Sequence, residues 1–244
     1  LRGLVGSEMC IRDRNIPFES ALAKSHNARM FKHIKAEAVN ATQTLAVERG
    51  EAPDAVGEGV RNVHLLAVAP NASSSIICGN TSPSIEPYRA NAFTQKTKSG
   101  SSLLKNEYLE HVLQELGEDT DEVWKSIITN SGSVQHLEFL DEWTKDVFKT
   151  AVEIDQRWII EMAADRQEEI CQSQSLNIFF PANVSKQELH AIHMMAWKRR
   201  VKTLYYLRSE AIKRAETVSD EALRQYIFDS ICLLYTSDAA DECS

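Results

Sequence analysis

The chain has 244 residues, and its 43% hydrophobic composition is enough to bury the core of one large domain or of two small ones. A formal net charge of -8 at pH 7 argues against broad, nonspecific binding to nucleic acid. No apolar run approaches the ~20 residues that a membrane-spanning helix needs, and the first residues lack the charge pattern of a signal peptide. The sequence therefore predicts a cytoplasmic protein with neither nucleic acid nor membrane as a partner.

The two ends of the chain follow no clean helical or strand period. LRGLVGSEMCIRDR (residues 1–14) and LLYTSDAADECS (residues 233–244) resemble translated adapter read-through at the ends of assembled environmental sequences. We therefore expect segments 1–14 and 231–244 to be non-native and segment 15–230 to hold the evolved domain. The alternative is that both ends are frayed native termini.

The cysteines are scattered and form no CxxC pair and no cluster with histidines, so neither a disulfide framework nor a metal site is predicted. If the two ends are non-native, the native cysteines are Cys78 and Cys171.

The first predicted elements are a long helix, a strand and a polar loop. Within residues 28–49 apolar side chains recur at steps of three and four, which indicates an amphipathic helix that Gly50 ends. HLLAVAP (residues 64–70) is a short apolar run typical of a buried strand. The glycine and prolines of residues 71–89 then favour a loop. The apolar face of the helix is predicted to comprise Phe31, Ile34, Ala38, Ala41 and Leu45.

The middle of the chain predicts a strand and several helices. Residues 91–97 favour a strand, and residues 106–116 a helix that Gly117 closes. Residues 121–129 favour a further short helix. The periodic stretch 138–167 fits one or two long helices whose many carboxylates form a solvated face.

The last elements are a strand, a helix and a strand. SLNIFFP (residues 175–181) predicts a buried strand, and the capping box that begins at Ser185 opens a helix reaching about Arg199. The segment VKTLYYLRSEA (residues 201–211) predicts a short strand, because Val201, Thr203, Leu204, Tyr205 and Tyr206 favour that conformation. Adjacent strand residues point to opposite faces, so we expect the two tyrosine rings not to lie together. The whole order predicts an α/β architecture with a largely parallel sheet.

Two motifs suggest chemistry. NASSS follows the strand predicted at 64–70, and its small polar side chains and backbone N–H groups suit a phosphate, although an ordinary serine-rich turn has the same composition. Tyr205 and Tyr206 are adjacent phenols, and a phenol that loses a proton and an electron becomes a neutral radical, so a touching pair can relay an oxidising equivalent. Structural tyrosines are the alternative.

Four stretches in order resemble the large, catalytic subunit of class I ribonucleotide reductase, over about residues 28–215. They are APNASSSIICGNTSPSIEPYRANAF (69–93), GSVQHLEFLDEWTKDVFKTAVEIDQRWIIEMAADRQ (132–167), QSLNIFFPANV (174–184) and KTLYYLRSEAIKRA (202–215).

The resemblance implies a fold and a set of site residues. The fold is the C-terminal part of that family's ten-stranded α/β barrel, which is helix-rich. Tyr205 and Tyr206 would pass a radical, with Tyr206 nearer the subunit boundary. The substrate, a ribonucleoside diphosphate, would be held by its diphosphate at Asn71, Ala72, Ser73 and Ser74, with Ser75 adjoining.

The resemblance also implies partners. The radical would come from a small subunit that carries the dimetal centre, so no cofactor is expected in this chain. Thioredoxin or glutaredoxin would reduce the intact enzyme, whose large subunit forms a homodimer. The product, deoxyribonucleoside diphosphate, serves DNA synthesis.

Departures from the family pattern limit what the chain does alone. The family's radical-bearing cysteine, its neighbouring asparagine and glutamate and the reducing cysteine pairs have no equivalents, and Cys78 and Cys171 lie in the wrong motifs. We therefore expect the fragment itself to be inactive. The alternative function is a noncatalytic, helix-rich interaction or regulatory domain with the tyrosines in its core.

Overall fold

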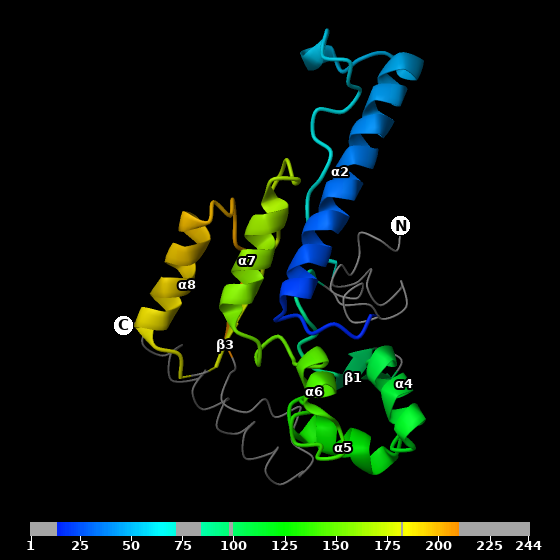
Figure 1. The fold of residues 1–244 in the computed structure, drawn as a ribbon, viewed down its shortest axis with the longest axis vertical. Helices are drawn as coiled ribbons and strands as arrows, with labels where there is room; N and C mark the ends of the chain where they lie inside the picture. Colours follow the sequence, from blue (N-terminus) through cyan, green and yellow to red (C-terminus); the bar gives the residue numbers. More distant parts are fainter. Residues whose placement is uncertain (1–13, 72–83, 98–99, 182, 210–244) are drawn as a thin grey trace, which may run out of the picture.

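The computed structural model describes residues 14–71, 84–97, 100–181 and 183–209. A long helix runs along the molecule with two shorter helices beside it, and a second group of helices gathers at one end (Figure 1). The first three are α2 (Ala21–Arg49), α7 (Gln156–Gln167) and α8 (Lys186–Lys198), and the second group is α4 (Glu107–Leu116), α5 (Asp121–Thr129) and α6 (Glu142–Val147).

Helix α2 begins seven residues before the predicted start, at Ala21, because the Ser20 side chain caps it by accepting a hydrogen bond from the Ala23 N–H. It ends at Gly50, as predicted. The predicted apolar face is wrong in its second half, where Ala41 is exposed and Thr42 and Ala46 are buried. The cause is the returning chain, whose Arg61 N–H is bonded to both Thr42 oxygens.

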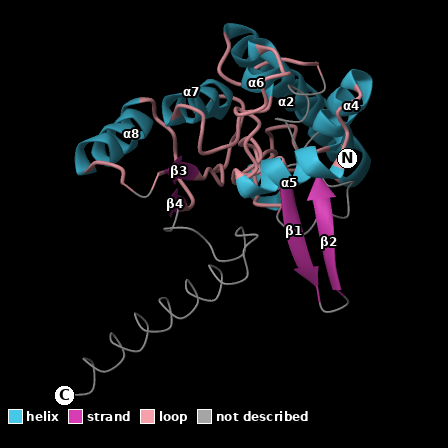
Figure 2. Cartoon of the chain, turned by 90° about the horizontal axis from the view of Figure 1, so that it is seen from below, coloured by secondary structure: helices cyan, strands magenta, loops and turns pink. Residues whose placement is uncertain are grey.

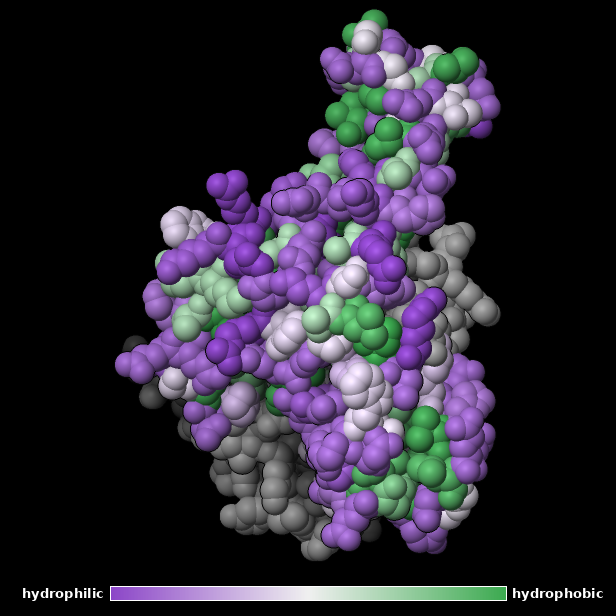
Figure 3. Space-filling view, in the orientation of Figure 1, coloured by the Kyte–Doolittle hydropathy of each residue, from purple (hydrophilic) through white to green (hydrophobic). Residues whose placement is uncertain are grey.

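The far end of α2 continues into a projecting loop that contains the 3-10 helix η1 (Pro53–Ala55). Figure 3 shows apolar groups at this tip of an otherwise largely hydrophilic face, where Val56 and Val63 are exposed. This loop is held closed by hydrogen bonds and not by a buried apolar core. The Glu51 carboxylate accepts the N–H groups of Gly57 at 2.7 Å and Gly59 at 2.6 Å.

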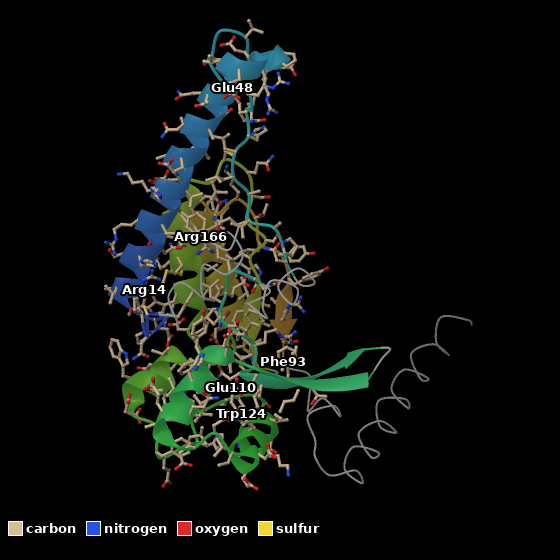
Figure 4. All side chains as sticks on the ribbon, turned by 90° about the vertical axis from the view of Figure 1, so that its right-hand side faces the viewer. Arg14, Glu48, Phe93, Glu110, Trp124 and Arg166 are labelled. Atoms are coloured by element: carbon tan, nitrogen blue, oxygen red, sulfur yellow. The ribbon has the colours of Figure 1, made fainter. Side chains whose placement is uncertain are left out.

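A first core lies where α2, α7 and α8 meet, and Phe31, Ile160 and Ile192 are among its buried side chains. Arg166 is also buried there, on α7 facing α2 (Figure 4). Its Nε donates to Gln174 Oε1 at 2.5 Å, and burial lowers the pKa of its guanidinium to about 9.

A second core lies under α4, α5 and α6 and contains Leu109, Trp124 and Phe148. The helices predicted at 106–116 and 121–129 are confirmed, and Gly117 ends the first in the left-handed conformation. Stretch 138–167 forms two helices, α6 and α7, separated by residues 148–155.

The strand predicted at 91–97 is confirmed as β1 (Ala92–Thr97), which pairs antiparallel with β2 (Gly100–Lys105). This hairpin projects from the body of the molecule (Figure 2). Asn91 holds its base, since its Nδ2 donates to the backbone oxygens of Gly132 at 3.0 Å and Phe148 at 2.7 Å.

The parallel part of the fold is short. The strand predicted at 175–181 is confirmed as β3 (Ile178–Phe180), and it pairs in parallel with β4 (Leu207–Ser209). The strand predicted at 64–70 is wrong, because only Val68 forms a bridge, to Gln174. Two backbone N–H groups that a ladder would use, those of Leu65 and Leu66, are bonded to the Cys171 sulfur instead.

An ion-pair network ties the three helices of the first core together. Lys24 of α2 lies 2.9 Å from Glu161 and 3.4 Å from Asp165, both on α7. Arg199, at the end of α8, also pairs with Glu161. Burial works to raise the pKa of Glu161, but the hydrogen bonds from Lys24 and Arg199 outweigh it and hold that pKa below its ordinary 4.5.

Glu161→Gln is expected to lower the free energy of unfolding at pH 7 by about 0.5–1 kcal/mol, the range of a partly exposed ion pair. A depressed native pKa stabilises above the unfolded value, so the difference from the parent chain should vanish as the pH falls below 4.5. Urea unfolding at several pH values measures it. Glu48→Gln, at the exposed far end of α2 (Figure 4), is the control, and an equal loss there would contradict the network.

Candidate functional site

The two tyrosines lie directly before β4 and are fixed by backbone bonds to the segment that leads into β3. The Tyr205 N–H donates to the Leu176 oxygen at 2.7 Å, and the Tyr206 oxygen accepts the Ile178 N–H at 3.0 Å. These bonds extend the parallel pairing beyond β3 and β4. The short strand predicted within residues 201–211 is confirmed as β4 (Leu207–Ser209), although the two tyrosines lie directly before it and not in it.

The two phenol rings are in contact. Their centroids are 4.1 Å apart and their planes are inclined at 57°. Tyr205 is 46% exposed and Tyr206 is 52% exposed, so neither is a core residue. The prediction that the rings point to opposite faces is wrong, because the alternation of side chains holds only in regular strand and the pair precedes β4.

A hydrogen bond between the two phenols and the nearby Arg208 cation both act on the pKa of Tyr205. A hydrogen bond with Tyr206 is the main cause that raises the pKa of Tyr205, while the charge of Arg208 acts to lower that pKa. A hydrogen bond raises the pKa of a phenol when the phenol donates it, because donation favours the protonated form. The Arg208 guanidinium carbon lies 5.0 Å from the centre of the Tyr206 ring. The hydrogen bond with Tyr206 and the charge of Arg208 thus act on the pKa of Tyr205 in opposite directions.

Buried polar groups lie behind the pair. The Asn177 Nδ2 donates to Glu86 Oε2 at 3.3 Å, and the Asn177 backbone N–H donates to Glu86 Oε1. Glu86 is 1% exposed. Burial raises the pKa of Glu86, while hydrogen bonds from Ser84 and Asn177 oppose that rise.

Sequence reasoning missed these residues. The available signal was a lone carboxylate, Glu86, between Ile85 and Pro87, inside the loop predicted at 71–89.

The predicted phosphate cradle is mostly outside the described residues. Asn71 is described and partly buried, three residues after Val68, which forms an isolated parallel bridge with Gln174. Ala72, Ser73, Ser74 and Ser75 lie outside the described residues, as does Cys78.

Cys171 is a free thiol that is partly buried, and its sulfur accepts the N–H groups of Leu65 at 3.0 Å and Leu66 at 3.1 Å. Burial works to raise the pKa of this thiol, but these two bonds outweigh it and lower that pKa. In the part of the chain that the structure describes, no three His, Cys, Asp or Glu side chains are grouped as metal ligands. Nor does any helix of that part have the length and apolar character to cross a membrane.

The described residues form helices packed around two short parallel strands, with a tyrosine pair beside them, which are the kinds of element that an α/β barrel contains. The model of one family, described as "Ribonucleotide reductase, barrel domain", matches residues 52–207. The chain therefore belongs to the ribonucleotide reductase barrel-domain family, and the fold expected from its sequence is confirmed.

Relatives agree with this assignment. The chain is 48% identical to the ribonucleoside-diphosphate reductase large subunit of Invertebrate iridescent virus 6, over 89% of this chain and 23% of that protein. It is 44% identical to the corresponding subunit of Invertebrate iridescent virus 3, over 88% of this chain and 35% of that protein.

Among solved structures, the Actinobacillus ureae class Id ribonucleotide reductase alpha subunit superposes with a TM-score of 0.78 at 39% identity, over 85% of this chain and 38% of that one. The chain thus spans between about a quarter and two fifths of the length of these relatives.

Proposed function

We propose that this chain is part of the large subunit of a class I ribonucleotide reductase, which when intact reduces ribonucleoside diphosphates to deoxyribonucleoside diphosphates by radical chemistry. The contact between the two phenols carries the proposal. The rings are 4.1 Å apart and both are partly exposed, as a relay between a protein surface and a buried site requires. The alternative of a noncatalytic domain had placed these tyrosines in a core, which their exposure contradicts.

The relay would work as a balanced hydrogen-atom transfer. An oxidant held by a small subunit first takes an electron from Tyr206, whose phenol proton leaves with it, and a neutral radical remains. The O–H bond of Tyr205 then breaks as that of Tyr206 re-forms, and the radical is left on Tyr205. The ring centroids are 4.1 Å apart, so the two phenols are already neighbours before this second step.

The metal would belong to the small subunit and not to this chain. The dimetal centre of the small subunit supplies the oxidising equivalent, and the described residues of this chain only conduct it. The small subunit would dock over the exposed side of Tyr206. Thioredoxin or glutaredoxin would reduce the intact protein, which would act as a homodimer in the cytoplasm.

The intact reading frame in the source DNA tests the proposal at the level of the gene. It should encode an upstream asparagine, cysteine and glutamate constellation and a C-terminal cysteine pair. The protein translated from it should reduce ribonucleoside diphosphates when mixed with its small subunit. A reading frame that encodes neither the upstream constellation nor the C-terminal cysteine pair would overturn the enzyme assignment.

We also propose that Asn71, Ala72, Ser73, Ser74 and Ser75 hold the substrate diphosphate. The supporting observation is that Asn71 follows three residues after Val68, which pairs in parallel with Gln174, so it lies at the carboxyl end of that paired segment, where α/β folds bind ligands.

In the restored enzyme, Ser73→Asp is expected to weaken binding of a ribonucleoside diphosphate at least about tenfold, by like-charge repulsion. Ser73→Ala should have a smaller effect, because it removes one hydroxyl and adds no charge. Equilibrium dialysis with labelled substrate measures both. Unchanged affinity in the aspartate variant would count against the cradle.

A further inference from the structure

A line of polar groups joins the interior of the molecule to the tyrosine pair. Glu86 is buried, Asn177 bridges it to the next group, and the Arg208 Nε donates to Asn177 Oδ1 at 3.5 Å. The same guanidinium lies over the ring of Tyr206, 5.0 Å from its centre. A carboxyl group, an amide and a cation thus follow one another toward the exposed phenol.

The amide of Asn177 can satisfy both neighbours in one orientation only. Its NH₂ group donates to the Glu86 carboxylate and its oxygen accepts from Arg208. The reversed amide would turn its oxygen toward the carboxylate and its NH₂ group toward the guanidinium, so that both contacts would become repulsive. The buried carboxylate therefore orients the amide, and the oriented amide favours a cation at the position of Arg208.

Resting on the proposed relay, we propose that Arg208 sets how readily the tyrosine pair is oxidised, and that Glu86 and Asn177 are positioning residues that hold its guanidinium against Tyr206. A cation over a ring face stabilises the electron-rich phenol. The neutral radical has lost electron density, so it gains less from the cation. Arg208 should therefore make Tyr206 harder to oxidise and so regulate the entry point of the relay.

The direction in which the pKa of Tyr205 changes distinguishes this role of Arg208 from a purely structural one. Arg208 acts to lower the pKa of Tyr205, whereas the hydrogen bond with Tyr206 raises it. Removing the cation should therefore raise the pKa of Tyr205 further. A substitution that merely loosened the pair would weaken the hydrogen bond and move that pKa the other way.

The test uses the 244-residue chain with two probes. In one sample 3-fluorotyrosine replaces Tyr205, and ¹⁹F NMR follows its titration. In the other 3-aminotyrosine replaces Tyr206, so that this position is oxidised before the other aromatic residues, and a redox titration gives its midpoint. Arg208→Gln should raise the pKa of residue 205. It should also favour oxidation of residue 206 by about two- to fivefold in equilibrium constant, the size of one exposed cation–π contact.

Further variants test whether the Arg208 guanidinium is the cause of both shifts. Arg208→Lys, which keeps the charge, should shift both readouts less than Arg208→Gln. Arg157→Gln removes an exposed cation that is paired with Asp155 on α7, and it should shift neither. Asn177→Ala should act in the same direction as Arg208→Gln, and the double variant should match Arg208→Gln alone, because both changes act through one guanidinium.

Either of two results would overturn the inference. One is that Arg208→Gln behaves like Arg157→Gln or lowers the pKa of residue 205. The other is that the effects of Asn177→Ala and Arg208→Gln add. Both readouts are made without turnover, so they do not depend on the relay. The relay proposal is contradicted by a different result, namely that phenylalanine variants of the tyrosines stay active. The fluorine signal of each variant also shows whether the protein is folded, so a misfolded variant is recognised before its pKa is compared.

Discussion

Tyr205→Phe and Tyr206→Phe are each expected to abolish ribonucleoside diphosphate reduction in the restored enzyme, by at least roughly a thousandfold, or about 4 kcal/mol of activation free energy. Phenylalanine keeps the ring and loses the O–H bond, so no hydrogen atom can move between the rings. Steady-state product formation with the small subunit present measures the loss. Substrate affinity should be unchanged, which distinguishes a broken relay from a damaged binding site.

Tyr108→Phe is the control for these two variants, because this tyrosine is on α4 and packs against the second core. It should retain turnover within a few fold. Because Tyr205 and Tyr206 are each about half exposed, their phenylalanine variants should also keep the thermal midpoint of the parent chain. Near-normal turnover of either variant would exclude the relay.

Gly132→Ala is expected to be the most destabilising single change among the described glycines. Gly132 has φ +83°, and a Cβ there would lie 2.3 Å from the Ala90 Cβ and 2.5 Å from the Ala90 Cα. The backbone must therefore move, and Asn91, which is bonded to the Gly132 oxygen through both its N–H and its Nδ2, must move with it. Overpacking and left-handed strain together should cost roughly 3 kcal/mol or more of unfolding free energy.

Gly117→Ala separates the two causes of this loss. Gly117 has φ +73°, close to that of Gly132, but nothing lies within 4 Å of the position of a Cβ. It should therefore show the conformational cost alone, about 1 kcal/mol. Chemical denaturation of both variants followed by circular dichroism makes the comparison. Equal losses would show that the close approach to Ala90 is relieved without cost.

Local chemistry made much of the helical structure predictable. Ser185 caps α8 through its own side chain and Gly117 ends α4, so both boundaries were predicted from a residue at that boundary, whereas the cap of α2 at Ser20 was missed. Segment 64–70, where a strand was wrongly predicted, did not follow from local chemistry in this way. Its backbone partners come from Cys171 and its neighbours, about a hundred residues away, and no local pattern specifies a sulfur as acceptor.

The candidate site was predictable only in part. The adjacency of Tyr205 and Tyr206 is visible in the sequence, but their ring contact depends on where β4 begins, and that is set by pairing with β3. Glu86 and Asn177 are 91 residues apart in the chain, so their hydrogen bonds arise only in the folded state. Arg208 stood in the sequence as one more basic residue until its position over Tyr206 was known.

The division into two cores also bears on how the chain reaches this fold. The second core draws its buried residues from Ala92 to Phe148, whereas the first joins Ile16 to Ala196. Closing a long loop costs more conformational entropy than closing a short one, and contacts between distant residues form late. We therefore expect the part that carries the hairpin to condense early, and the parallel pairing of β3 with β4, beside which the two tyrosines lie, to form later with the first core.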